Sequence, residues 1–191
     1  MSLIRVSHPG FVNRVLVSAA GIFVPLFDAL VPRHRNVLAV LGTPDGKLLI
    51  PASNLVGDAG DVFYAQKGAG AATTNAFGVH ELASATSGIV KGSHRGAFTV
   101  IGSTQKAHTS TYPKVSDADA DNTGAGADII TWLATYAKGD FNHAAITHGL
   151  ITNATPGASE PILTGYAFAA SFEKTANDTL KVFVNHEMSG Q

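Results

Sequence analysis

The sequence predicts a mostly β protein: an antiparallel β-sandwich or jelly-roll-like domain with long loops and an N-terminal arm. In the last third of the chain, apolar and polar residues alternate along four segments, as they do when successive side chains point to opposite faces of a sheet. Polar breaks separate these segments at residues 138–142, 153–160 and 173–178. Short alternating strands with such breaks are typical of an antiparallel sandwich.

The four predicted strands are Ile129–Ala137, Ala145–Thr152, Pro161–Phe172 and Thr179–Met188. The first is rich in β-branched and aromatic residues, which favour a strand over a helix. One face of the third strand carries large apolar side chains, from Ile162, Tyr166, Phe168 and Phe172.

The fourth strand has one apolar face, made by Leu180, Val182 and Val184. Its other face is polar apart from Phe183, and consists of Thr179, Lys181, Asn185 and Glu187. We therefore predict that this second face is solvated or meets a partner. Trp132, Phe168, Phe172 and Val182 are expected to share one buried core.

The chain is expected to divide into an N-terminal arm or packing element, residues 1–35, and a β-rich domain, residues 36–191. Val15–Val31 is apolar, but Pro25 and Asp28 interrupt it, and it is marginal for the roughly 20 residues that span a bilayer. We interpret it as a structured N-terminal element and predict no membrane segment. The pattern of Phe11–Ala20 fits an amphipathic helix or a strand, and both remain open.

Shorter signals fill the middle of the chain. Asn36–Leu41 and Lys47–Ile50 form a predicted hairpin, because Pro44-Asp45-Gly46 supplies turn residues between them. Glycines mark Pro51–Asn75 as loop-like, with a short strand at Asp61–Gln66. Three more predictions follow along the chain: strands at Phe77–Leu82 and Phe98–Gly102, and an irregular segment over Ser103–Ala127.

Composition limits the classes of function. Charged residues make up 14% of the 191, well below the usual quarter, and the net charge is −1. Such a chain has no electrostatic footprint for nucleic acid, and its low charge favours a protein that lives packed against others. The absence of Cys excludes disulfides and thiol chemistry.

No catalytic motif is present. The sequence lacks a G-x-S-x-G elbow, a P-loop and a dinucleotide fingerprint, so we predict a protein that is not an enzyme. No pair of its eight histidines has the helical spacing of a metalloprotease. In one arrangement of the strands, His148 and His186 lie side by side on neighbouring strands and form a weak metal site. We interpret the histidines instead as surface or interface side chains.

One acidic loop imitates a calcium site. Asp117, Asp119, Asp121 and Asp128 occupy positions 1, 3, 5 and 12 of a twelve-residue loop. Position 6 is Asn122 where an EF-hand has Gly, position 12 lacks the bidentate Glu, and no flanking helices are predicted. Two interpretations stay open: a non-helical loop that binds calcium, and a solvated turn whose Asp side chains bond to local backbone.

Several stretches of the chain resemble structural proteins of tailed-bacteriophage virions, of the capsid decoration (cement) or tail-associated type. The resemblance covers roughly the C-terminal half, and its strongest part is the closing pair of segments. The stretches are Thr111–Lys114 with 117–128, Ile151–Leu163, Phe168–Thr175 and Asp178–Val184. They carry no catalytic residues, so the resemblance implies none.

The leading hypothesis is a non-enzymatic virion protein that is bound to the capsid and stabilises the shell. It implies a homo-oligomer, a trimer being one option, with the major capsid protein or other virion proteins as partners. Its location would be the virion, after synthesis in the host cytoplasm. A tail, baseplate or fibre component is the first alternative. A carbohydrate- or host-surface-binding module is the second, with Trp132, Tyr136 and Tyr166 as a sugar platform beside the acidic loop.

Overall fold

The computed structural model describes residues 3–8, 11–16, 37–116 and 129–187. This described part is mostly β, as predicted, and contains one α-helix, α2 (Asp58–Gly68), and a short 3-10 helix, η2 (Arg95–Ala97). The long strands of the main sheet are β3 (Val37–Thr43), β4 (Gly46–Val56), β5 (Phe77–Thr86), β9 (Ile129–Tyr136), β10 (His143–Asn153), β11 (Thr164–Lys174) and β12 (Thr179–Glu187). Its short strands are β6 (Phe98–Val100), β7 (Lys106–Ala107) and β8 (Lys114–Ser116).

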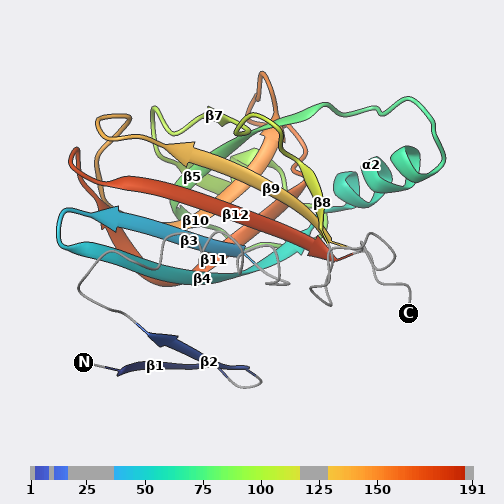
Figure 1. Ribbon diagram of the computed structural model, residues 1–191. Helices are drawn as coiled ribbons and strands as arrows, with labels where there is room; N and C mark the ends of the chain where they lie inside the picture. The colour runs from blue at the N-terminus through green and yellow to red at the C-terminus, as the bar shows by residue number, and fades with distance from the viewer. Residues whose placement is uncertain (1–2, 9–10, 17–36, 117–128, 188–191) are drawn as a thin grey trace.

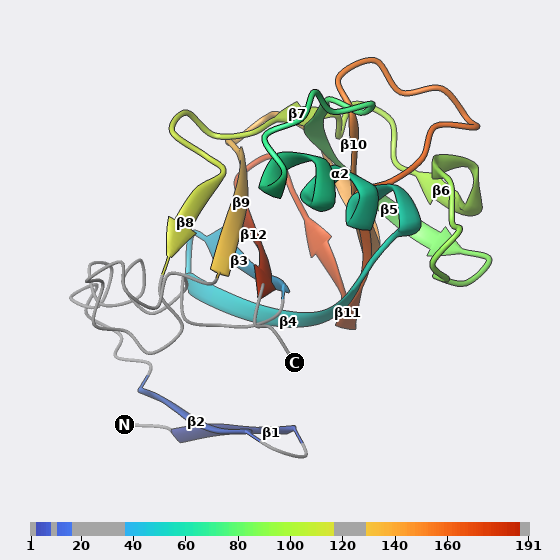
Figure 2. The ribbon, with the colours of Figure 1, turned by 90° about the vertical axis from the view of Figure 1, so that its right-hand side faces the viewer.

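These strands form one continuous antiparallel sheet rather than two separate ones. Its order is β6-β5-β10-β11-β4-β3-β12-β9-β8, with β7 added beside β5. The sheet curls until its halves face each other across the core, and Figure 2 shows α2 lying across one end. The amide N–H of Thr109, just after β7, donates to the carbonyl of Leu133 in β9 over 2.8 Å. This bond joins the two sides of the curled sheet.

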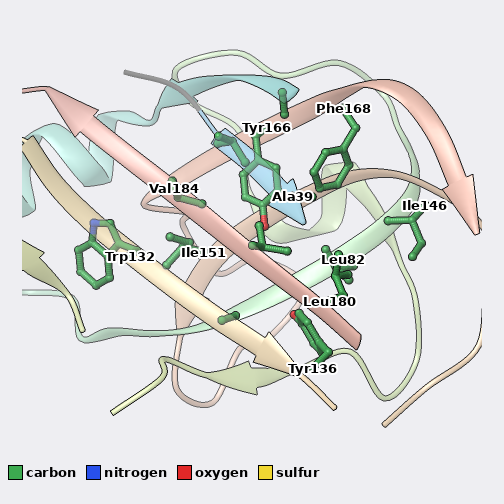
Figure 3. Close-up of a cluster of buried hydrophobic side chains, with 14 of the residues drawn as sticks. Ala39, Leu82, Trp132, Tyr136, Ile146, Ile151, Tyr166, Phe168, Leu180 and Val184 are labelled. Carbon is green, nitrogen blue, oxygen red and sulfur yellow. The ribbon is translucent and has the colours of Figure 1, made fainter. Parts of the chain in front are cut away.

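The four strands predicted for the last third are confirmed, with ends shifted by a few residues. β12 pairs with both β9 and β3, while β11 pairs with β10 and β4. Large apolar side chains gather between the halves of the sheet (Figure 3). Trp132, Phe168, Phe172 and Val182 are all buried in this one cluster, as the alternation predicts.

The predicted hairpin is confirmed as β3 and β4. Thr43 pairs with Gly46, so Pro44 and Asp45 alone make the turn. Gly46 has φ +151°, a conformation that glycine accepts and other residues rarely adopt.

The prediction for residues 51–75 is wrong in two places. β4 continues through Pro51 to Val56, because its partner β11 supplies a second row of hydrogen bonds. The strand predicted at Asp61–Gln66 is part of α2. Asp58 and Asp61 lie in the first turn of this helix and Lys67 in the last, which complements the helix dipole.

The polar face of β12, which was predicted to be solvated or to meet a partner, is partly covered by the chain itself. Phe183 and Asn185 are buried and Lys181 is partly buried. Phe183 joins a small cluster on the outer side of the sheet, with Leu38, Leu133 and the partly buried Tyr112. Tyr112 belongs to the segment predicted to be irregular. That segment contains β7 and β8 and contributes to the cover of this face, which the alternation within β12 cannot reveal.

The N-terminal segment contains β1 (Leu3–His8) and β2 (Phe11–Leu16), paired antiparallel in a sheet of their own. Of the two patterns open for Phe11–Ala20, the structure has a strand as far as Leu16. Residues 17–36 lie outside the described part. Within that part, no helix is long and apolar enough to cross a bilayer.

Candidate functional site

The most unusual group of side chains lies beneath α2, at the end of the curled sheet. It combines three histidines with the one tryptophan of the chain and a tyrosine. They come from five segments: Tyr64 from α2, His80 from β5, His108 from beyond β7, Trp132 from β9 and His186 from β12. We call this group the histidine cluster.

Backbone contacts place α2 over the cluster. The N–H of Gly57 donates to the carbonyl of Leu163 over 3.0 Å, and the N–H of Asp58 to that of Lys91 over 2.8 Å. Gly60 allows the close approach, because a Cβ there would stand 2.3 Å from the Leu163 oxygen. Phe63, one turn on, packs edge-on against Phe77, with ring centroids 5.4 Å apart.

A directed chain of hydrogen bonds ties α2 to two strands. The indole nitrogen Nε1 of Trp132 donates to Oη of Tyr64 over 2.9 Å. Oη of Tyr64 is also bonded to Nδ1 of His186. An indole N–H can only donate, so Tyr64 accepts from Trp132 and its own hydrogen points to His186. Nδ1 of His186 is then the acceptor, which assigns the proton of this neutral imidazole to Nε2.

The other two histidines lie against each other and against the tryptophan. The ring of His80 meets that of His108 edge-on at 4.9 Å between centroids, and His108 lies 4.8 Å from Trp132. His80 is fully buried, and neither of its ring nitrogens has a hydrogen-bond partner among the described residues. Nε2 of His186 is likewise buried without a partner in that part of the chain.

Burial keeps these imidazoles neutral. It lowers the pKa of His186 to about 3. It lowers the pKa of His80 well below the ordinary value, and the nearby His108 and His186 lower it further. Burial also lowers the pKa of His108, against a smaller opposing effect from the Phe77 backbone. Burial raises the pKa of Tyr64, so the phenol keeps its proton.

The three imidazoles can take up protons where water reaches them, because it is burial that keeps them neutral. In the described part of the chain, none of the three imidazoles bonds to a Ser or Thr hydroxyl or to a carboxylate. A histidine that activates a Ser or Thr nucleophile needs a hydrogen bond to that hydroxyl, together with a group that orients the ring. Nor does that part hold three or more His, Asp or Glu side chains arranged to bind a metal ion.

The residues predicted as sites have different outcomes. Asp117, Asp119, Asp121 and Asp128 lie outside the described residues, so the calcium-like loop stays a prediction.

The proposed sugar platform is wrong. Trp132, Tyr136 and Tyr166 are exposed by only 2%, 0% and 0%, so no sugar can stack on them. All three belong to strands that close around the core, where the alternation turns their rings inward.

His148 and His186 are not brought together. His148 pairs with Ala167 and Ala83 across β11 and β5, whereas His186 pairs with Ile130 of β9. His148 lines an open groove on the outer side of the sheet. The other residues of this groove are Ser53, Asn54, Leu55, Thr86, Gly88, Ile89 and Ala167.

The histidine cluster itself was missed, and the interpretation of its histidines as surface groups is wrong for His80 and His186. One signal was available, since His186 continues the alternation of Leu180, Val182 and Val184 along the core face. His80 likewise shares the face of the buried Leu82. The contact of His186 with Tyr64 cannot be predicted from a local pattern, because the two residues are 122 positions apart in sequence.

Comparison of the chain with models of protein families, with curated proteins and with solved structures found no match in any of the three.

Proposed function

We propose that this chain is a non-enzymatic structural protein of a tailed-phage virion, and specifically a decoration protein that binds the capsid and stabilises the shell. The sequence resemblance motivates the proposal. Its other supports are the low charge, the mostly β fold, and a histidine cluster that lacks a nucleophile in the described residues.

One structural observation carries the proposal. Among the described residues, β1 and β2 pair only with each other and add no strand to the main sheet. A lone two-stranded hairpin is at best marginally stable in water. We therefore expect another surface to hold this arm, and a neighbouring subunit or a capsid shell would supply one. An arm and a compact β body suit a protein that links copies of itself or clamps a shell.

The decisive experiment locates the full-length chain in virions of the phage that encodes it. We expect mass spectrometry of purified virions to find the chain, and antibody labelling seen by electron microscopy to place it on heads. Its absence from virions would contradict the proposal. Labelling confined to tails or fibres would favour the tail, baseplate or fibre alternative instead.

A binding assay tests the role of the arm. Capsids stripped of the protein are mixed with the full-length chain or with a variant that lacks residues 1–16, and both are followed by sedimentation. We expect the full-length chain to co-sediment and to raise the melting temperature of the capsids, and the shortened variant to do neither. Equal binding by the two chains would show that the arm is not needed to bind the capsid.

A further inference from the structure

Helix α2 is attached to the sheet by few groups. Of its eleven residues only Gly60 and Phe63 are buried. Besides the packing of Phe63, its side-chain contacts include the bonds of Tyr64 within the histidine cluster and an exposed ion pair between Asp61 and Lys91. Exposed pairs contribute little to stability. The hold on α2 therefore depends largely on Phe63 and on the hydrogen bonds of Tyr64.

The bond between Tyr64 and His186 requires a neutral imidazole. Protonation of Nδ1 would place an N–H against the Tyr64 oxygen, which already accepts from Trp132. The tyrosine hydrogen would then lose its acceptor in a buried position, where an unpaired polar group destabilises the structure. A charge on His186 therefore destabilises the closed position of the helix.

Nothing described around His186 offsets a positive charge. The groups that face the cluster are Tyr64 from α2, His80 from β5 and His108 from beyond β7, and Lys67 of α2 lies over the ring of Phe63. No carboxylate whose side chain the structure describes forms an ion pair with the three imidazoles. Within the described part of the chain, a proton on one of the three imidazoles would therefore meet neutral rings and form no ion pair.

We propose that α2 is an acid-sensitive lid: protonation of His186 releases the helix from the end of the sheet, while the sheet itself stays folded. The backbone bonds of Gly57 and Asp58 form the hinge at its start. Opening lets water reach the imidazoles and exposes Trp132 and Phe77. Figure 1 shows α2 at one end of the main sheet, where Phe63 joins the same buried cluster as Trp132 and Phe168.

The size of the effect follows from linkage. An exposed imidazole has a pKa of about 6.5, so the open form takes up protons below that pH while the closed form does not. Each such histidine shifts the ratio of open to closed molecules toward open by up to about tenfold per pH unit. The closed lid therefore has its greatest stability above about pH 6.5, and it loses that stability progressively as the pH falls below this value.

The one tryptophan of the chain reports directly on the lid, since its indole is bonded to Tyr64 and is 2% exposed. In the full-length protein we expect acidification from pH 7.5 to 4.5 to shift Trp132 emission to the red and to increase quenching by acrylamide. The far-UV circular dichroism of the sheet should stay unchanged over this range. Loss of the sheet signal together with the emission shift would overturn the proposal in favour of global unfolding.

A non-titrating variant identifies the responsible group. His186→Asn retains an oxygen acceptor near the position of Nδ1 and cannot be protonated at this pH. We expect its emission change to move to lower pH by about half a unit or more. His94→Asn, at an exposed position, is the matched control and should leave the transition where it is. Identical transitions in all three proteins would overturn the proposal.

Hydrogen exchange of the wild-type chain tests the lid even if the variant fails to fold. After correction for the intrinsic effect of pH, protection of the amides of α2 should fall at least tenfold between pH 7 and pH 5. Protection of β10 and β11 should hold. Equal protection of α2 at the two pH values would contradict an acid-sensitive lid.

Discussion

The ring of Tyr166 lies directly over the backbone of Gly149, its neighbour across β10 and β11. A Cβ at position 149 would stand 2.3 Å from Cε2 and 2.4 Å from Cζ of that ring. No real Cβ contact is this short, so the glycine is what lets the tyrosine occupy the centre of the core, where Figure 3 shows it.

Gly149→Ala should therefore destabilise the protein. Tyr166 is fully buried among other core side chains, so the added methyl group overpacks the core. Such changes cost about 1–3 kcal/mol. Urea unfolding followed by circular dichroism measures the loss, and replacing Tyr166 by Leu in the same chain should recover part of it. Wild-type stability of Gly149→Ala would show that the pairing of β10 and β11 is wrong.

Two buried tyrosines should respond differently to loss of the hydroxyl. Oη of Tyr136 donates to the carbonyl of Thr104 over 3.0 Å, whereas Oη of Tyr166 has no partner in the described part of the chain. Tyr136→Phe should cost about 1 kcal/mol in the free energy of unfolding, as for a typical hydrogen bond. Tyr166→Phe should be neutral or stabilising. Equal losses in urea unfolding would contradict this contrast.

Phe168→Ala should cost about 3–5 kcal/mol, from lost transfer free energy and the cavity left behind. Phe168 packs edge-on against both Tyr166 and Phe172, at 5.5 and 5.0 Å between centroids. Phe168→Leu, which retains most of the volume, is the control and should lose much less. If Phe168→Ala and the wild type had the same urea midpoint, Phe168 would not be part of the packed core.

Deletion of residues 1–31 should yield a chain that aggregates or fails to assemble. The apolar run Val15–Val31 is expected to pack on the β domain or on a neighbouring subunit, since an exposed apolar patch of that size marks a contact surface. Light scattering and the capsid assay together measure the outcome. A soluble shortened chain that still joins particles normally would refute this role.

Replacing Asp117, Asp119 and Asp121 by Asn should weaken assembly and leave the isolated fold stable. Three carboxylates so close in sequence repel one another, and a neighbouring subunit that supplies Lys, Arg or backbone N–H groups would offset the repulsion. Melting curves with calcium and with EDTA separate this hypothesis from a metal site. A large rise in melting temperature with calcium would establish the metal instead.

The sequence by itself determined the class of fold and much of the core. Apolar and polar residues alternate along a strand whenever one face of that strand is buried. This pattern predicts β9 to β12 and the inward direction of Trp132, Phe168 and Val182. The turn residues Pro44 to Gly46 likewise act locally, which is why the hairpin of β3 and β4 is predictable.

Only the tertiary structure decided what covers the two faces of the sheet and what meets at its ends. The glycines around α2 resemble a loop in sequence, yet Gly60 is there because the Leu163 backbone needs the space. Phe183 is buried by a segment far away in the chain. Hydrogen bonds join Tyr64 to Trp132 and to His186 across long sequence separations. No local pattern of residues predicts these bonds, because they form only when the whole sheet curls.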